Sequence, residues 1–105
     1  MKATIWHHPR CSKSRAALAL LHAAGADVTV IDYVKTPPTA DDLARLYARA
    51  GLTPRQGLRG DAPPLADDTI LAAMAADPTI IERPLVETER GVVLARPPEL
   101  VRRIL

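Results

Sequence analysis

Short β-prone runs alternate with a longer stretch of helical periodicity in the first third of the chain. Residues 3–7 are β-prone and are followed by Pro9, which predicts a first strand. Residues 12–24 carry Ala and Leu at helical spacing and precede Gly25, so we expect a helix that ends there. Residues 28–33 predict a second strand. A strand, a helix and a strand in this order imply a crossover between parallel strands.

The middle of the chain, about residues 39–78, has helical patterns and no strand pattern. Thr39 is placed as an N-cap for a helical stripe that ends at Gly51. A short helical turn is expected within residues 53–59, and residues 60–64 form a loop. A further helix is expected to start at Asp67 or Asp68 and to end at Asp77-Pro78. We therefore expect a helical insertion after the second strand.

The end of the chain predicts a hairpin and a last helix. Residues 85–88 and 92–95 are two apolar strands around the turn at 89–91. Pro97-Pro98-Glu99 then opens a last helix over residues 100–105. The order β-α-β, helices, β-β-α is the thioredoxin layout with a helical insertion. We predict an α/β, thioredoxin-like three-layer fold with a mixed sheet, forming a single domain over residues 1–105.

Composition narrows the class of protein. A chain of 105 residues with 48% hydrophobic residues can bury a core without disulfides or a metal. Its net charge is only +2, and it has neither a basic stripe nor the aromatic residues that stack on bases, so we expect no nucleic-acid partner. No apolar run approaches a membrane span. With one cysteine and no signal peptide, we expect a cytoplasmic protein, and we expect it to be a monomer.

Cys11, the only cysteine, falls at the predicted turn from strand to helix. Thiol chemistry needs the thiolate, which a helix N-terminus and nearby cations favour. Lowering a thiol pKa by about two units takes about 2.7 kcal/mol, whereas a helix N-terminus supplies only about 0.3–1 kcal/mol. Adjacent cations must therefore contribute; the candidates are His7, His8, Arg10, Lys13 and Arg15. Strand alternation places His7 and His8 on opposite sides, so we expect only one to approach the sulfur.

The same helix start is a candidate anion site. Its free backbone N–H groups, with the hydroxyls of Ser12 and Ser14, can bind an oxyanion beside the thiolate. Ser14 takes the second cysteine position of a C-x-x-C motif, so the chain lacks a local resolving thiol. If Cys11 performs redox chemistry, the second sulfur must come from another molecule.

Simpler interpretations remain open at this point. A lone cysteine is often a buried small hydrophobe, and Ser12 and Ser14 can be plain helix caps. The His7-His8 pair has no third ligand cluster, so we expect no metal. Spacing alone gives no reason to separate Arg59, Arg83 or Arg96 from ordinary surface arginines.

Several blocks of sequence resemble the glutaredoxin-dependent arsenate reductase family. The first reads Thr-Ile-Trp-His-His-Pro-Arg-Cys-Ser-Lys-Ser-Arg over residues 4–15, where the family has Asn in place of His8. The others are Tyr-Val-Lys-Thr-Pro-Pro at 33–38, Leu-Arg at 58–59, Ile-Ile-Glu-Arg-Pro-Leu-Val at 80–86 and Ala-Arg-Pro-Pro-Glu at 95–99. The chain is similar to the short housekeeping branch, and its segment between Arg59 and Asp67 is shorter than in many relatives.

The resemblance implies roles for six residues. It implies Cys11 as the nucleophile, with His7 and Ser14 keeping the thiol ionised. It further implies oxyanion binding by Arg59, Arg83 and Arg96, and a cis peptide bond between Arg83 and Pro84.

The resemblance also implies a reaction. The Cys11 thiolate attacks arsenate, glutathione adds as an external thiol, and glutaredoxin takes up the glutathione as arsenite is released. No bound cofactor is implied. Two alternatives stay open: a related thiol oxidoreductase with another substrate, and a redox-responsive regulator that binds RNA polymerase. Regulators of that kind usually carry C-x-x-C, which Ser14 interrupts here.

Overall fold

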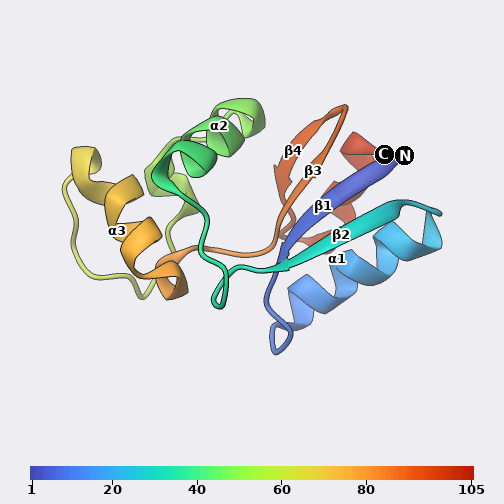
Figure 1. Cartoon of the computed structure of the whole chain (residues 1–105), viewed down its shortest axis with the longest axis horizontal. Helices are drawn as coiled ribbons and strands as arrows, with labels where there is room; N and C mark the ends of the chain where they lie inside the picture. Colours follow the sequence, from blue (N-terminus) through green and yellow to red (C-terminus); the bar gives the residue numbers. More distant parts are fainter.

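A mixed four-stranded sheet forms the centre of the computed structural model, which describes all of residues 1–105. The strands lie in the order β2 (Asp27–Asp32), β1 (Lys2–His7), β3 (Leu85–Thr88), β4 (Gly91–Leu94). β1 and β2 are parallel, whereas β3 runs antiparallel to both β1 and β4. Figure 1 shows the crossover helix α1 (Ser12–Ala23) joining the parallel pair. The predicted β-α-β opening, hairpin and mixed sheet are confirmed.

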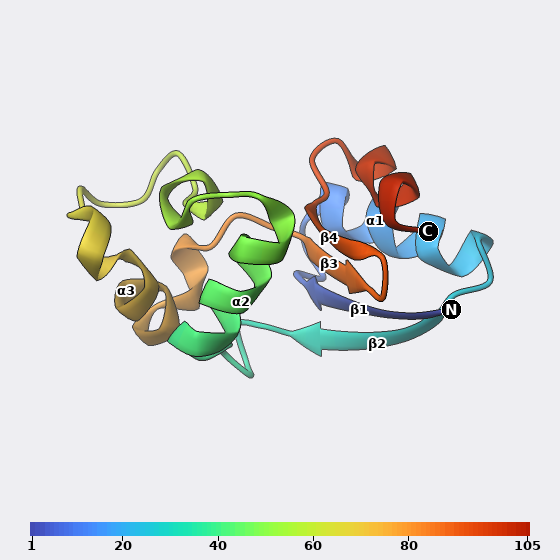
Figure 2. The same ribbon diagram turned by 90° about the horizontal axis from the view of Figure 1, so that it is seen from above.

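One face of the sheet is covered by α1 and by the 3₁₀ helix η4 (Pro98–Ile104), which lie on the same side in Figure 2. The residues buried between them and the sheet form one core cluster: Ala3, Ile5, Ala17, Leu21, Val86, Ala95, Val101 and Ile104. The predicted last helix is present and opens within residues 97–99 as expected, since it begins at Pro98, and it is 3₁₀ throughout. Pro98 in its first turn has a fixed φ that suits a helix start.

The helical insertion gathers at one end of the molecule (Figure 1). It comprises α2 (Ala40–Ala50), η1 (Pro54–Gly57), η2 (Asp67–Thr69), α3 (Ile70–Ala76) and η3 (Pro78–Ile80). Its apolar side chains join the other face of the sheet in a second cluster: Trp6, Tyr33, Leu43, Leu46, Tyr47, Ile70, Met74, Ile80, Ile81, Leu85 and Val92. The insertion therefore shares its core with the sheet.

Local signals explain the bounds of α2. The Thr39 hydroxyl accepts from the Asp42 N–H at 3.0 Å, and the Asp42 carboxylate accepts from the Thr39 N–H at 3.3 Å. This reciprocal pair satisfies two backbone donors at the helix start. Gly51 ends the helix in the left-handed region, with φ of 69°. Both predicted ends are confirmed.

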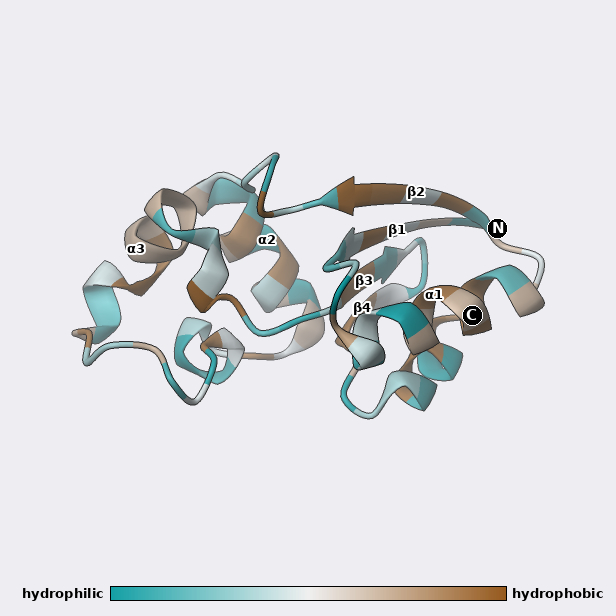
Figure 3. Cartoon of the chain, turned by 90° about the horizontal axis from the view of Figure 1, so that it is seen from below, coloured by the Kyte–Doolittle hydropathy of each residue, from teal (hydrophilic) through white to brown (hydrophobic).

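The edge strand β2 carries exposed hydrophobic surface. β2 is coloured largely brown in Figure 3, and Val30 on it is 47% exposed. No helix is both long enough and apolar enough to cross a bilayer.

The peptide bond Arg83–Pro84 is cis, as expected, and Arg96–Pro97 is cis as well, which was not anticipated.

Candidate active site

Cys11 occupies the N-cap position of α1, at the turn where β1 gives way to the helix. Its backbone is extended, its N–H donates to the His8 carbonyl at 3.0 Å, and its carbonyl accepts from the Arg15 N–H at 3.0 Å. The thiol is half-buried. The predicted position of the sulfur, beside the free N–H groups of a helix start, is confirmed.

The surroundings favour the thiolate. Burial acts to raise the pKa of the Cys11 thiol, but other groups outweigh it and the pKa lies below its ordinary value. Those groups are the Ser14 backbone N–H, the Arg83 guanidinium and the Lys13 backbone N–H. The Arg96 Nη1 atom lies 3.9 Å from the Cys11 Sγ and adds a second guanidinium. The helix start and two distant arginines therefore stabilise the charge together.

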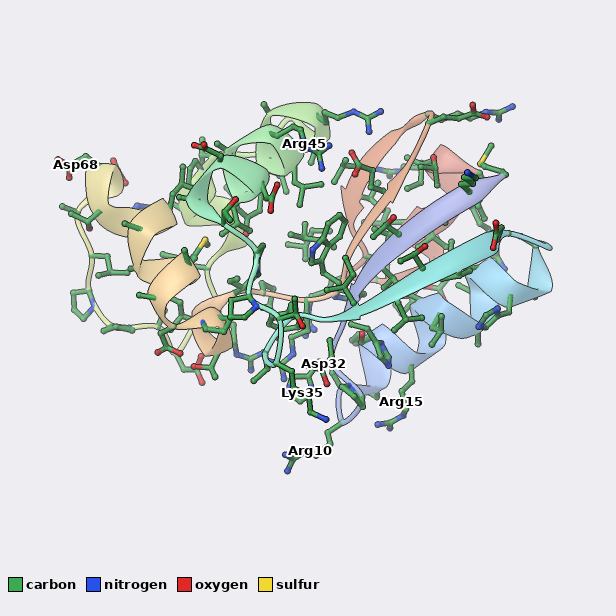
Figure 4. The ribbon with its side chains drawn as sticks, viewed as in Figure 1. Arg10, Arg15, Asp32, Lys35, Arg45 and Asp68 are labelled. Atoms are coloured by element: carbon green, nitrogen blue, oxygen red, sulfur yellow. The ribbon has the colours of Figure 1, made fainter.

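The arginines that flank Cys11 in sequence are directed elsewhere. Arg10 points away from the fold in Figure 4. The Arg15 Nη1 donates to the Pro9 carbonyl at 3.0 Å. The cation that lowers the pKa of the thiol is Arg83, which precedes β3 and is far from Cys11 in the sequence. The prediction that neighbouring cations lower the pKa of the thiol is therefore wrong for Arg10 and Arg15, whose exposed side chains lie in solvent.

His7 and Ser14 form a buried pair behind the thiol. The His7 Nδ1 and the Ser14 Oγ are 2.6 Å apart, and the His8 backbone N–H donates to the same Oγ at 3.0 Å. Since that Oγ accepts from His8, its own proton is available to the His7 Nδ1. Burial lowers the pKa of His7, which favours the neutral form of its ring. His7 is thus not the cation considered from the sequence; its ring joins the end of β1 to the first turn of α1.

His8 lies just after the end of β1, and its ring contacts other groups than the His7 ring does. Its Nδ1 accepts from the Arg10 backbone N–H at 3.2 Å, and its ring centroid is 6.2 Å from that of Tyr33. Burial, followed by the charge of Arg83, lowers the pKa of His8. The neutral form of His8 is therefore favoured as well.

The three arginines implied by the resemblance converge on one place. Arg59 follows η1, Arg83 precedes β3 and Arg96 follows β4. The Arg96 Nη1 donates to the Arg83 carbonyl at 3.0 Å. The Nη1 atoms of Arg59 and Arg96 lie 3.2 and 3.7 Å from the same carboxylate oxygen of Glu82. Spacing could not single out these residues, but the fold brings them together beside Cys11.

Backbone bonds hold Arg59 in this cluster although the segment after it is short. The Arg59 N–H donates to the Ile80 carbonyl at 2.9 Å, and the Glu82 N–H donates to the Gly57 carbonyl at 2.8 Å. Leu58 and Ile81 pair as an isolated antiparallel bridge. The position of Arg59 therefore depends on the segment before β3 and not on the length of the loop after it.

Two further residues near the site, Glu82 and Tyr33, were assigned no role from the sequence. Glu82 accepts a hydrogen bond from the Arg59 side chain and forms an ion pair with Arg96, and its place beside Arg83 in the chain was the only available signal. Tyr33 and Arg83 line one pocket, and the Tyr33 hydroxyl and the Arg83 Nε are both buried with no hydrogen-bond partner. No three His, Cys, Asp or Glu side chains are grouped to hold a metal ion.

The arrangement has a clear chemical capacity. A half-buried thiol with a lowered pKa carries a larger fraction of thiolate, the nucleophilic form, than an ordinary cysteine does at the same pH. Guanidinium groups within a few ångströms bind oxyanions through charge-assisted hydrogen bonds. The fold and the site together define a thioredoxin-like α/β protein with one free, half-buried cysteine beside an arginine cluster.

Comparison with known proteins identifies the family. Residues 6–104 match the ArsC family. The arsenate reductase of Rhizobium meliloti (strain 1021) is 40% identical over 115 residues, covering 100% of this chain and 82% of that protein. That of Escherichia coli (strain K12) is 38% identical over 112 residues, covering 97% and 79%. This chain belongs to the ArsC family.

Solved structures agree with the family. The arsenate reductase from Vibrio cholerae superposes with a TM-score of 0.91 at 40% identity, covering 100% of this chain and 98% of that one. A putative arsenate reductase from Yersinia pestis superposes with a TM-score of 0.89 at 40% identity, covering 97% and 99%. The thioredoxin-like fold of this chain is therefore that of its relatives.

Proposed function

We propose that this chain reduces arsenate to arsenite, with Cys11 as the nucleophile and glutathione and glutaredoxin as external thiols. The observation that carries the proposal is a thiol of lowered pKa beside converging arginines, in a chain with no second cysteine. Relatives over nearly the whole chain are named arsenate reductases, which supports the choice of oxyanion.

The first step is a displacement at arsenic. The Cys11 thiolate attacks arsenate, a sulfur–arsenic bond forms, and one arsenic oxygen leaves as water after protonation. Arg59, Arg83 and Arg96 hold the remaining oxygens by charge-assisted hydrogen bonds and offset the charge that develops there. His7 and Ser14 act indirectly, because their hydrogen bond fixes the turn that carries the sulfur.

The later steps use two external thiols. Glutathione adds to the arsenic and releases a second water. The glutaredoxin thiolate then attacks the glutathione sulfur, and the electron pair of the broken sulfur–arsenic bond reduces arsenic from +5 to +3. Water hydrolyses the remaining Cys11 adduct to free arsenite. The sum is arsenate plus two thiols giving arsenite, one mixed disulfide and water, and it needs no bound cofactor. We place this reaction in a reducing cytoplasm, performed by a monomer.

A coupled assay tests the proposal. Purified protein is supplied with arsenate, glutathione, glutaredoxin, glutathione reductase and NADPH, and NADPH consumption is followed. We expect turnover by the wild type and none by Cys11→Ser, with the thermal unfolding midpoint of the variant within a few degrees of the wild type. Turnover that persists in Cys11→Ser, or its absence from the wild type, would refute the proposal. Omitting glutaredoxin separately tests which thiol takes up the glutathione.

A further inference from the structure

Glu82 already occupies donors that an incoming oxyanion needs. Its Oε1 lies 3.2 Å from the Arg59 Nη1 and 3.7 Å from the Arg96 Nη1, and accepts from the Arg83 backbone N–H at 3.4 Å. The same Arg96 nitrogen lies 3.9 Å from the Cys11 Sγ. One guanidinium nitrogen therefore stands between the nucleophile and an internal carboxylate.

The carboxylate is well placed to oppose anion binding. The Glu82 side chain is only 20% exposed, so water screens its charge incompletely. It offsets one of three arginine charges in the cluster. An oxyanion bound at the sulfur faces the repulsion of this carboxylate and must also share or take over its hydrogen-bond donors. Coulomb energy grows in proportion to the charge of the ligand, so dianions are opposed more than monoanions.

We propose that Glu82 is an internal competitor for the arginine cluster, and that it sets the affinity and charge selectivity of the oxyanion site. Oxyanion binding exchanges the carboxylate for a ligand oxygen at Arg59 and Arg96. Between ligands, Glu82 keeps these two guanidinium groups gathered near Cys11. The inference rests on the proposed oxyanion site.

The substitution Glu82→Gln isolates the charge. Glutamine keeps the length of the side chain and an acceptor oxygen for the arginines, and it removes the negative charge. Sulfate and nitrate serve as probes because their charges, two and one, are constant near neutral pH. Binding is measured as protection of Cys11 from iodoacetamide, at constant ionic strength. Since Cys11 is the only cysteine, the alkylation signal comes from this site alone.

We expect Glu82→Gln to lower the half-protecting concentration about threefold for nitrate and about tenfold for sulfate, since the Coulomb energy doubles with the charge. Glu82→Met, also uncharged and of similar length, should tighten sulfate binding in the same direction. Circular dichroism confirms that each variant is folded before titration.

Glu87→Gln is a matched control. Like Glu82, Glu87 forms ion pairs with two arginines, here Arg45 and Arg49, and its side chain is 17% exposed. It pairs across the sheet with Thr4, away from the Cys11 end of β1. The half-protecting concentrations of this variant should match the wild type.

The outcomes separate the two proposals. If sulfate protects the wild type and Glu82→Gln leaves that protection unchanged or weakens it, the role of Glu82 is refuted and the oxyanion site stands. An equal gain for nitrate and sulfate refutes charge selectivity. If neither anion protects Cys11 in either protein, the proposed oxyanion site fails, and the inference fails with it.

Discussion

The pKa of the Cys11 thiol is lowered although burial opposes the shift, because backbone donors and arginines act on one sulfur. The backbone part follows from local sequence: an extended N-cap leaves the N–H groups of Lys13 and Ser14 free to stabilise the thiolate. The arginine part does not follow from local sequence. Arg83 and Arg96 reach the sulfur only because β3 pairs with β1 and β4 pairs with β3.

The pH dependence of Cys11 alkylation tests this account. A lowered pKa means that thiolate persists below the pH at which free cysteine is protonated, and the rate falls only as pH drops through the lower value. We expect the inflection of the wild type below that of free cysteine. Arg83→Gln should move it upward, whereas Arg10→Gln should leave it in place because Arg10 points away from the fold (Figure 4). Equal effects of the two substitutions would contradict the assignment to Arg83.

Ser14 stabilises the turn between β1 and α1 through buried hydrogen bonds. Its side chain is fully buried, and its Oγ bonds both the His7 ring and the His8 N–H. Ser14→Ala leaves both partners unsatisfied, so we expect a loss of about 1–3 kcal/mol in the free energy of unfolding. Urea denaturation measures it. Ser12→Ala, at an exposed position two residues earlier in the same helical turn, should cost less than about 0.5 kcal/mol. Equal costs would show that the buried hydrogen bonds add little.

At the scale of elements, strong local signals in the sequence were sufficient to predict the strands and the ends of α2, but not every feature of the fold. The Thr39 cap and Gly51 stop gave the ends of α2, and apolar runs gave the strands. The 3₁₀ character of η4 and the cis bond before Pro97 could not be predicted, because tertiary packing decides among the conformations that a proline-rich segment allows. The cluster of Arg59, Arg83 and Arg96 needed the family pattern, since each arginine has an ordinary local sequence.

An ion-pair cluster joins α2 to the hairpin. Glu87 on β3 bonds Arg45 and Arg49 of α2, and Arg49 also donates to the carbonyls of Thr88 and Glu89. Arg45 is the main cause of a Glu87 pKa below its ordinary value; burial opposes the shift and Arg49 supports it. Because the folded-state pKa is lowered, this contribution to stability is present above the unfolded-state pKa. It is lost as pH falls through the folded-state value.

Glu87→Gln should therefore change the acid limb of stability. We expect the variant to lose about 1 kcal/mol at neutral pH, a modest value because Arg45 is half exposed. Below the ordinary Glu pKa of 4.5, the gap between wild type and variant should narrow as pH falls. Urea denaturation at a series of pH values measures this gap. A gap that stays constant through the acid range would show that Glu87 does not contribute through its charge.

At the scale of the whole molecule, β1 connects two cores. Ile5 and Trp6 are successive residues that point to opposite faces of the sheet, and they belong to different buried clusters. One cluster lies under α1 and η4, and the other contains the helical insertion. The site depends on both, because Cys11 follows β1 whereas Arg59 comes from the insertion.

A shared strand predicts that both cores unfold together, as a single domain would. Leu21→Ala in one cluster and Leu43→Ala in the other each delete a fully buried side chain, and each should cost about 2–5 kcal/mol. Urea unfolding is followed by far-UV circular dichroism and by the fluorescence of Trp6, the only tryptophan. The two signals should coincide in both variants, since Trp6 lies on the strand that the clusters share. If Leu43→Ala instead made fluorescence change at lower urea than circular dichroism, the insertion would unfold separately. Arg59 would then leave the site while Cys11 remained in place.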